Sequence, residues 1–300
     1  MGVYEIRDRD EAVSIMVDKA NIAADTIKNN YDCCVAYYDE HLLEISIEQR
    51  RLLGEFEPAL QNDEFVMYLQ PQVKRDGAAK GAEALVRWVH PSRGILTPYA
   101  FIDILENAGL IYKLDLYIWE KAAQKLAEWK EKGYGSYHIS VNISTKDFYI
   151  IDIYETFTGL INKYGIAASN LHLEITETTL MTDFEKNMNI IHKLQGVGFR
   201  VEIDDFGSGY SSLNMLKDIS ADVLKIDMGF LRKSENEVKG QDILESIITL
   251  AGKIGMDVIT EGVETKKQLD MLTMMGCHEF QGYYFSKPVP VSEFEEKYLV

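Results

Sequence analysis

The sequence predicts an α/β fold, a (β/α)8 TIM-like barrel preceded by a short α/β segment and a linking helix. Three observations predict it: strand-like runs alternate with helical stretches, the alternation fills residues 57–300, and polar residues end the strands. The runs are EFVMYLQPQV, GAEALVRWV, YHISVNIS, LHLEITE, RVEIDDFG, DVLKID, DVITEGVE and EFQGYYF. Eight such strands over about 250 residues are typical of this barrel. A doubly wound open sheet is less favoured, because no G-x-G-x-x-G turn occurs.

Between most of the predicted strands, apolar residues recur with helical spacing, which predicts helices there. The predicted helices cover residues 99–109, 111–132, 147–164, 184–196, 212–217, 241–254 and 265–275. Upstream, the pattern predicts a strand at 2–6, a helix at 11–29, a strand at 33–39 and a charged helix at 41–53. Two strands and a helix cannot close a core alone. We therefore divide the chain into an α/β segment (1–40), a linker helix (41–56) and the barrel (57–300).

The composition limits the classes of partner and compartment. The 300 residues carry a net charge of −17, which argues against a nucleic-acid polymer, because such binding needs Lys and Arg surfaces. Three cysteines without a C-x-x-C pair favour a reducing, cytoplasmic setting. No apolar run of about eighteen residues occurs, so we expect no membrane contact within this chain. Any membrane attachment would depend on upstream segments that lie outside it.

Polar side chains recur at the carboxyl ends of the predicted strands, where barrels of this kind build their active sites. They are Glu83, Asn142, Glu174, Glu177, Asp204, Asp205, Asp227, Glu261, Glu264 and Gln281. Carboxylate and amide oxygens are hard ligands that suit Mg²⁺ or Mn²⁺ rather than zinc. At a strand end the chain can turn both Asp204 and Asp205 toward the rim. The pattern therefore predicts a site for two ions.

Each of these features also has a purely structural interpretation. Asn142 can satisfy a buried turn, Lys225 can be a structural counter-ion, and Glu174 and Glu177 can form a solvated strand end. DDFGSGYSS can be a glycine-rich turn, and EGVE can supply a helix cap. Four histidines are expected to be structural rather than ligands: His90, His138, His172 and His278. We favour the functional interpretation because these motifs share one rim of the predicted barrel.

Seven separated motifs make residues 57–300 resemble the EAL domain family. In order they are EALVR at 83–87, VNIS at 141–144, EITE at 174–177, DDFGSG at 204–209, KID at 225–227, EGVE at 261–264 and QGY at 281–283. Residues 3–38 also resemble the C-terminal end of a GGDEF domain. The signature loop of that domain is absent from this chain, so we expect no cyclase activity in it.

The resemblance implies hydrolysis of cyclic di-GMP to linear pGpG by a homodimer that uses two Mg²⁺ or Mn²⁺ ions. It implies one ion held by Glu83, Asn142, Glu174 and Asp204, and a second held by Asp204, Asp205 and Glu261. Lys225 resembles the lysine that positions the attacking water, and Glu261 also resembles the general base. Glu177 and Glu264 resemble loop-anchoring glutamates, with Glu177 serving the loop 206–212. The positions that resemble nucleotide contacts are Gln70, Leu85, Arg87, Asp227 and Gln281.

Two other functions are compatible with the sequence. The first is a receptor that holds cyclic di-GMP without cutting it, and loss of a metal-binding acid would favour it. This chain has all of those acids. The second is a Schiff-base aldolase that uses Lys225, which would require a pocket that lowers the pKa of the lysine. Neighbouring carboxylates raise that pKa instead, so the aldolase is disfavoured.

Overall fold

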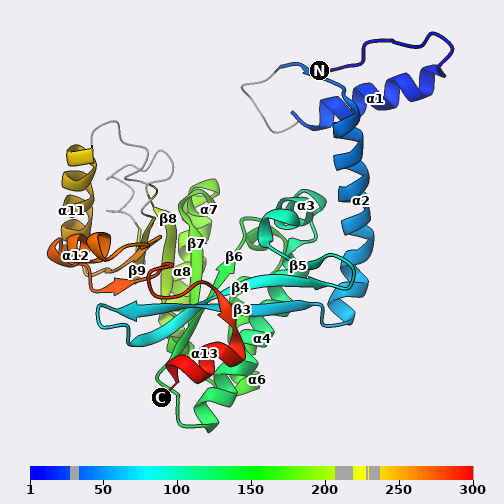
Figure 1. Ribbon diagram of the computed structural model, residues 1–300. Coiled ribbons are helices and arrows are strands. Elements are labelled where there is room, and N and C mark those ends of the chain that lie inside the picture. Colours follow the sequence, from blue (N-terminus) through cyan, green and yellow to red (C-terminus); the bar gives the residue numbers. More distant parts are fainter. Residues whose placement is uncertain (28–33, 207–218, 228, 230–236, 300) are drawn as a thin grey trace. The chain divides into compact units, whose positions relative to one another are not determined.

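The computed structural model describes residues 1–27, 34–206, 219–227, 229 and 237–299 (Figure 1). The chain forms two compact units. One contains Met1–Asp63 and Tyr99–Ala108, and the other contains Glu64–Pro98 and Gly109–Val300. In the described part of the chain, no helix combines the length and apolar composition that crossing a membrane requires.

The described residues of the smaller unit form one parallel strand pair and three α-helices. Its elements are β1 (Gly2–Val3), α1 (Val13–Asp25), β2 (Ala36–Tyr37), α2 (Glu40–Gln61) and α3 (Ile102–Ala108). Helix α2 begins where the Asp39 side chain accepts a hydrogen bond from Leu42 N at 3.0 Å. It runs past the predicted end at residue 53, because Phe56 and Ala59 continue its buried stripe despite Pro58.

Eight described strands of the larger unit close into a barrel, which confirms the predicted fold class. In the order of the ring they are β3 (Phe65–Lys74), β11 (Glu279–Phe280), β10 (Asp257–Glu261), β9 (Val223–Asp227), β8 (Val201–Phe206), β7 (Leu171–Thr176), β6 (His138–Ile143) and β4 (Ala79–His90). A β3–β4 pairing closes the ring. Two short strands extend it at the edges: β5 (Gly94–Leu96) on β4 and β12 (Val289–Pro290) on β3.

The barrel differs from an all-parallel one in the direction of β3. This strand is antiparallel to both β4 and β11. The reason is the short connection to β4, a turn over residues 75–78 in which Gly77 has a φ of 86° and donates from its N–H to Lys74 O at 2.9 Å. A parallel crossover needs a dozen or more residues, so a four-residue turn enforces a hairpin.

Helices follow most of the strands. They are α4 (Ile111–Glu131), α5 (Asp147–Ile150), α6 (Ile153–Tyr164), α7 (Glu177–Thr182), α8 (Phe184–Val197), α11 (Glu237–Lys253), α12 (Lys266–Met274) and α13 (Val291–Tyr298), with 3-10 turns at Pro98–Ala100 and Ala168–Asn170. The predicted helix 147–164 is divided in two, because Asp152 caps α6 by accepting from Glu155 N at 3.0 Å. The predicted helix 212–217 lies outside the described residues.

The strands alternate between an apolar outer face and a polar inner face. On β6, for example, Ile139 and Val141 are fully buried, and Trp119 of α4 donates to Asn142 O at 2.9 Å. The alternate residues reach across the ring: Ser140 of β6 donates to Glu202 of β8 at 3.1 Å, with β7 between them. The interior of this barrel is therefore filled in part by polar side chains, and these occur in two groups at opposite ends.

Candidate active site

At the carboxyl ends of the parallel strands, four carboxylates converge on Lys225. The ammonium Nζ lies 2.8 Å from Glu261 Oε1, 3.0 Å from Glu174 Oε1, 3.4 Å from Glu83 Oε2 and 3.5 Å from Asp204 Oδ1. These residues come from five different strands, and the side chains of Lys225 and Glu174 are fully buried. The structure thus brings together five of the residues that the sequence placed at one rim.

The charges in this cluster do not balance. Four carboxylates face one ammonium, and burial raises the pKa of Glu261 to about 8 against the opposing effect of Lys225. Burial and then the neighbouring Glu83 raise the pKa of Glu174 well above its usual value. Burial alone would lower the pKa of Lys225, but the carboxylates, Asp204 first among them, raise it well above its usual value. The cluster therefore favours the uptake of further cations.

The donor atoms fit a hard divalent ion. Within the described part of the chain, Glu174 Oε2 is buried without a hydrogen-bond partner, whereas Glu174 Oε1 and Glu261 Oε1 contact only the ammonium of Lys225. Buried oxygens of this kind are costly unless they are paired or coordinate a metal. The four side chains that contact Lys225 offer only oxygen ligands, without the nitrogen of histidine or the sulfur of cysteine. The set therefore suits Mg²⁺ or Mn²⁺.

Amide side chains surround Glu83. Asn142 Nδ2 donates to Glu83 Oε1 at 3.2 Å, and Gln281 Nε2 donates both to Glu83 Oε2 at 2.5 Å and to Gln70 Oε1 at 3.3 Å. The backbone of Gln281 is held by its N–H, which donates to Thr260 O at 2.9 Å, and by its carbonyl, which accepts from Val263 N at 3.2 Å. The next residue must be glycine, because a Cβ atom at Gly282 would be 2.2 Å from Val263 O. Glu83 is thus oriented by groups that lie far apart in the sequence.

Asp204 and Asp205 lie where β8 departs from regular pairing. The register with β9 shifts between Ile203 and Phe206, and Asp205 has a φ of 55°, an uncommon conformation for a residue other than glycine. Burial, Asp204 and then Asp227 raise the pKa of Asp205. Asp227, at the end of the neighbouring strand β9, thus adds to the negative charge that Asp205 experiences. Such local strain is typical of functional sites.

The other expected residues lie around this end. Arg87 packs over the Tyr68 ring, with 5.5 Å from Cζ to the ring centroid, and burial lowers the pKa of its guanidinium. Leu85 is half-buried on the same strand. Asp227 accepts from Gly229 N at 2.6 Å. Two glutamates follow strand ends: Glu177 begins α7, and Glu264 is exposed before α12. Of the loop 206–212, only Phe206 lies within the described residues.

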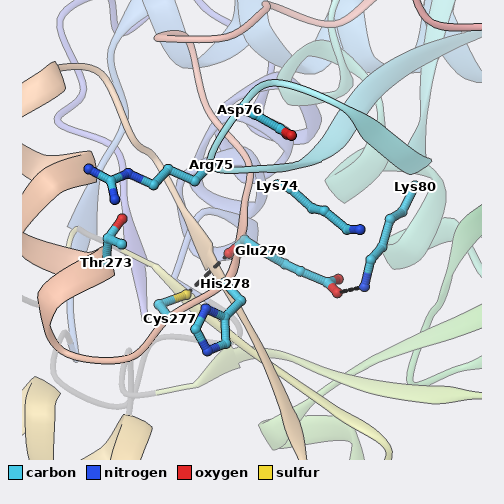
Figure 2. A pocket seen from close by; sticks show the side chains of 8 residues that line it. All are labelled: Lys74, Arg75, Asp76, Lys80, Thr273, Cys277, His278 and Glu279. Atoms are coloured by element: carbon cyan, nitrogen blue, oxygen red, sulfur yellow. Dashed lines mark hydrogen bonds and ion pairs between the residues drawn. The ribbon is translucent and has the colours of Figure 1, made fainter.

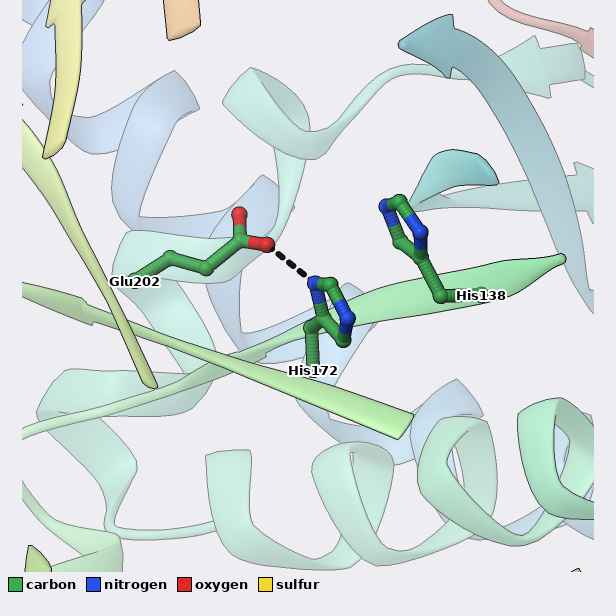
Figure 3. Close-up of side chains that lie close together, drawn as sticks. All are labelled: His138, His172 and Glu202. Atoms are coloured by element: carbon green, nitrogen blue, oxygen red, sulfur yellow. Dashed lines mark hydrogen bonds and ion pairs between the residues drawn. The ribbon is translucent and has the colours of Figure 1, made fainter. Parts of the chain in front are cut away.

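A second polar group, formed by His138, His172 and Glu202, lies at the opposite end of the barrel; from the sequence the two histidines were expected to be structural, and Glu202 was not singled out. Figure 3 shows these three side chains close together. Each residue offers one ligand atom within 4.8 Å of the other two. Burial holds the pKa of His138 well below its usual value. Burial would raise the pKa of Glu202, but the hydrogen bond from His172 lowers it to about 2. The sequence contains a signal for this group. In HIS, LHLE and VEID every second residue is polar, so the polar face of these strands continues from the acidic end toward the amino end.

A cavity of about 600 Å³ lies near the β3–β4 turn, and Figure 2 shows the side chains that line it. Lys74, Lys80 and His278 line it, and Lys80 forms an ion pair with Glu279. It contains none of the residues that the sequence placed in the site. The candidate active site is therefore defined by its converging charges rather than by this cavity.

Comparison with known proteins identifies the class of this fold and site. A profile of the EAL domain matches residues 54–288, and the chain belongs to the EAL domain family. In Pseudomonas aeruginosa, the bifunctional diguanylate cyclase/cyclic di-GMP phosphodiesterase MucR is 32% identical over 272 residues, 90% of this chain and 39% of the relative. The cyclic di-GMP phosphodiesterase PdeR of Escherichia coli is 33% identical over 80% of this chain and 36% of the relative.

Solved structures agree with this assignment. The structure of the PaMucR phosphodiesterase in complex with c-di-GMP has a TM-score of 0.77 and 33% identity, and the match covers 81% of this chain and 99% of that one. The EAL enzyme Bd1971, bound to cAMP and cyclic di-GMP, also gives a TM-score of 0.77 at 27% identity, over 96% of this chain and 76% of its own. The chain spans about two fifths or less of the length of the curated relatives MucR and PdeR.

Proposed function

We propose that this chain is a metal-dependent phosphodiesterase that hydrolyses cyclic di-GMP to linear pGpG. The convergence of four carboxylates on Lys225 carries the proposal. EAL domains are metal-dependent, and the relatives MucR and PdeR bear the name of cyclic di-GMP phosphodiesterases. An acidic protein can bind a phosphodiester at such a site because divalent ions separate the carboxylates from the phosphate.

The residues divide into two ligand sets. Glu83, Asn142, Glu174 and Asp204 would hold one Mg²⁺ or Mn²⁺, and Asp204, Asp205 and Glu261 would hold a second. When bound, such ions neutralise the phosphate oxygens and make a water more acidic. The gathering of Asp204 and Asp205 at one irregular strand end supports a shared site.

The chain's own residues would orient the reactants. Lys225 Nζ would hold the attacking water in line with the 3′-oxygen that leaves phosphorus, and Glu261, 2.8 Å away, would accept the proton of that water. One P–O bond forms with the water oxygen as the bond to the 3′-oxygen breaks. Arg87 would bind a phosphate oxygen by a charge-assisted hydrogen bond. The other nucleotide contacts would come from Gln70, Leu85, Asp227 and Gln281.

Three finer features belong to the same proposal. Glu177 and Glu264 would anchor the loops that border the site, the chain would act as a homodimer through the barrel, and it would work in the cytoplasm. The thiols of Cys34 and Cys277, which form no disulfide, support a reducing compartment. The sedimentation coefficient, measured with and without cyclic di-GMP, tests the dimer.

The test of the activity is direct. The protein is incubated with cyclic di-GMP and Mg²⁺ or Mn²⁺, with EDTA in a parallel sample, and the nucleotides are separated by chromatography. Metal-dependent formation of pGpG is expected, with none in EDTA. Bound but intact cyclic di-GMP with both metals would overturn the hydrolase and support a receptor instead.

A further inference from the structure

The pairing of β6 with β7 ends just beyond two residues of the first proposed ligand set. Asn142 and Glu174 are register partners, and the last pair between these strands is Ile143 with Ile175. Beyond it the backbones part, because β6 ends at Ile143 and β7 leads into α7 after Thr176. The ends of paired segments open most easily. Strand ends that carry ligands therefore need a further connection to keep them together.

Three threonine hydroxyls supply such a connection, which we call the threonine bridge. Thr145 follows β6, Thr176 is the last residue of β7, and Thr179 belongs to α7. Thr179 Oγ1 lies 2.7 Å from Thr145 Oγ1 and 2.9 Å from Thr176 Oγ1. Because a hydroxyl donates one hydrogen bond and accepts others, Thr179 can bond to both neighbours at once. The bridge thus continues the link between the two strands beyond their last paired residues.

The middle residue of the bridge is shielded from water and anchored. Thr179 is 1% exposed, and its N–H donates to Thr176 Oγ1 at 3.3 Å. Its carbonyl oxygen accepts from Nδ2 of Asn187, a buried residue of α8, at 2.9 Å. Water has little access to this position, so a solvent molecule does not easily take the place of the Thr179 hydroxyl.

The turn after β6 is fixed as well. Asp147 is fully buried, and its Oδ2 accepts from both the N–H and the hydroxyl of Ser144 at 2.8 Å. The N–H of Asp147 donates in return to Ser144 O at 3.2 Å. Thr145 lies between these two residues. Its hydroxyl is therefore presented to Thr179 by a turn that has its own hydrogen bonds.

The bridge acts on strand ends that their charges push apart. Thr176 is the register partner of Asp204 on β8 and lies two residues after Glu174, so the bridge borders on two of the converging carboxylates. Like charges at this separation repel. In the metal-free protein this repulsion separates the strand ends, and the threonine bridge opposes it.

We propose that Thr179 is a positioning residue, whose hydroxyl holds Asn142 and Glu174 at the spacing that one divalent ion requires. This inference rests on the proposed function, from which it takes the first ligand set. Without the bridge, part of the energy of ion binding is spent on ordering the strand ends. Loss of groups that support metal ligands costs about 10–100-fold in affinity. We expect the lower end of that range, because Thr179 acts through the backbone.

Direct binding of Mn²⁺ tests the proposal without substrate. Metal-free protein is titrated with Mn²⁺, and the free ion is followed by electron paramagnetic resonance. Thr179→Val keeps the shape of the side chain and removes the hydroxyl, so Mn²⁺ binding is expected to weaken about tenfold. Thr179→Ser keeps the hydroxyl and is expected to restore wild-type binding. The matched control is Thr182→Val on the same helix, since the exposed Thr182 donates to Thr178 O and takes no part in the bridge.

A double-mutant cycle separates the bridge from a general loss of packing. Thr145→Val removes the other partner of the same link. If both residues act through that link, the double variant binds Mn²⁺ no more weakly than Thr179→Val alone. Each variant is first checked for native circular dichroism. If Thr179→Val does not fold, Thr145→Val is compared with wild type in its place and is also expected to bind more weakly.

The outcomes distinguish this inference from the proposed activity. Unchanged Mn²⁺ binding in a folded Thr179→Val protein, or losses that add in the double variant, would overturn the role of Thr179 even if the chain forms pGpG. Weakened binding that Thr179→Ser restores supports that role even if no pGpG forms. Absence of Mn²⁺ binding in wild type would overturn both proposals.

Discussion

The two ends of the barrel interior bury charge in different ways. At the carboxyl end, Glu83, Glu174, Asp204 and Glu261 surround one ammonium, so negative charge is in excess. At the amino end, a single carboxylate, Glu202, shares a hydrogen bond with His172, so no second carboxylate competes with it there. An excess of hard oxygen donors attracts divalent ions and, through them, phosphates.

The comparison also shows why only one end was recognised from the sequence. The acidic residues occur in short motifs at strand ends, where a polar residue in a buried strand is conspicuous. His138, His172 and Glu202 lie at strand beginnings, where a polar residue is as easily attributed to the preceding loop. Their contacts with one another, and with Gln72 from β3, depend on closure of the ring.

The largest expected effect is the loss of hydrolysis when a charged residue is replaced at the carboxyl end of the barrel but not at the amino end. Glu174→Gln, which keeps the shape but removes the charge, is expected to reduce cyclic di-GMP hydrolysis at least about 100-fold, since loss of mere supporting residues of metal ligands costs about 10–100-fold. His172→Gln at the other end should retain wild-type hydrolysis in excess Mg²⁺ to within a small factor. Initial rates of pGpG formation measure both, and equal losses would contradict the separation of the two ends.

Lys225→Met tests the excess of negative charge. Loss of the orienting ammonium should reduce kcat on the order of 100-fold. The uncompensated carboxylates should also lower the free energy of unfolding by about 3–5 kcal/mol. Mg²⁺ should raise the melting temperature of this variant more than that of wild type, because cations replace the lost charge. Equal shifts in the two proteins would show that Mg²⁺ does not replace the charge of Lys225.

Exchange of Mg²⁺ for Ca²⁺ tests the geometry of the acidic end. Ca²⁺ also prefers oxygen ligands, but its bonds are longer and its coordination is looser. A two-ion site adapted to smaller ions should therefore bind Ca²⁺ and lose most of its activity. Rates measured at fixed Mg²⁺ with increasing Ca²⁺ should fall, and full activity in Ca²⁺ alone would exclude this explanation.

The smallest effect concerns the histidine end and pH. Because the pKa of His138 is held well below its usual value, the folded protein keeps this ring neutral while the unfolded chain takes up a proton below about pH 6.5. This contribution to stability is complete above pH 6.5 and is lost as the pH falls, by up to about 1.4 kcal/mol per pH unit. Urea unfolding in EDTA between pH 5 and 7.5 should show the slope.

His138→Asn supplies the matched comparison, because asparagine does not titrate. Its unfolding free energy should depend less on pH than that of wild type, whereas the exposed His278→Gln should keep the wild-type dependence. Parallel pH curves for wild type and His138→Asn would show that His138 is not the group responsible.

The sequence by itself determined the strand and helix alternation, the barrel class and the acids that gather at its carboxyl end. These follow from local patterns: apolar periodicity selects helix or strand, and parallel strands place their carboxyl ends at one rim. The same patterns predicted that α2 ends at residue 53, because Gly54 and Pro58 are poor helix formers. The helix in fact continues to Gln61, since its buried stripe continues past both residues.

Only the tertiary structure decided which polar groups meet. The antiparallel direction of β3 brings Gln70 toward Gln281 and Glu83, and Gln72 toward His138. Closure of the ring likewise places Lys225 at the centre of carboxylates from four other strands. A strand's own sequence specifies which residues face inward, but their partners across a closed ring depend on strand order, direction and stagger. Those are properties of the whole barrel rather than of any single segment.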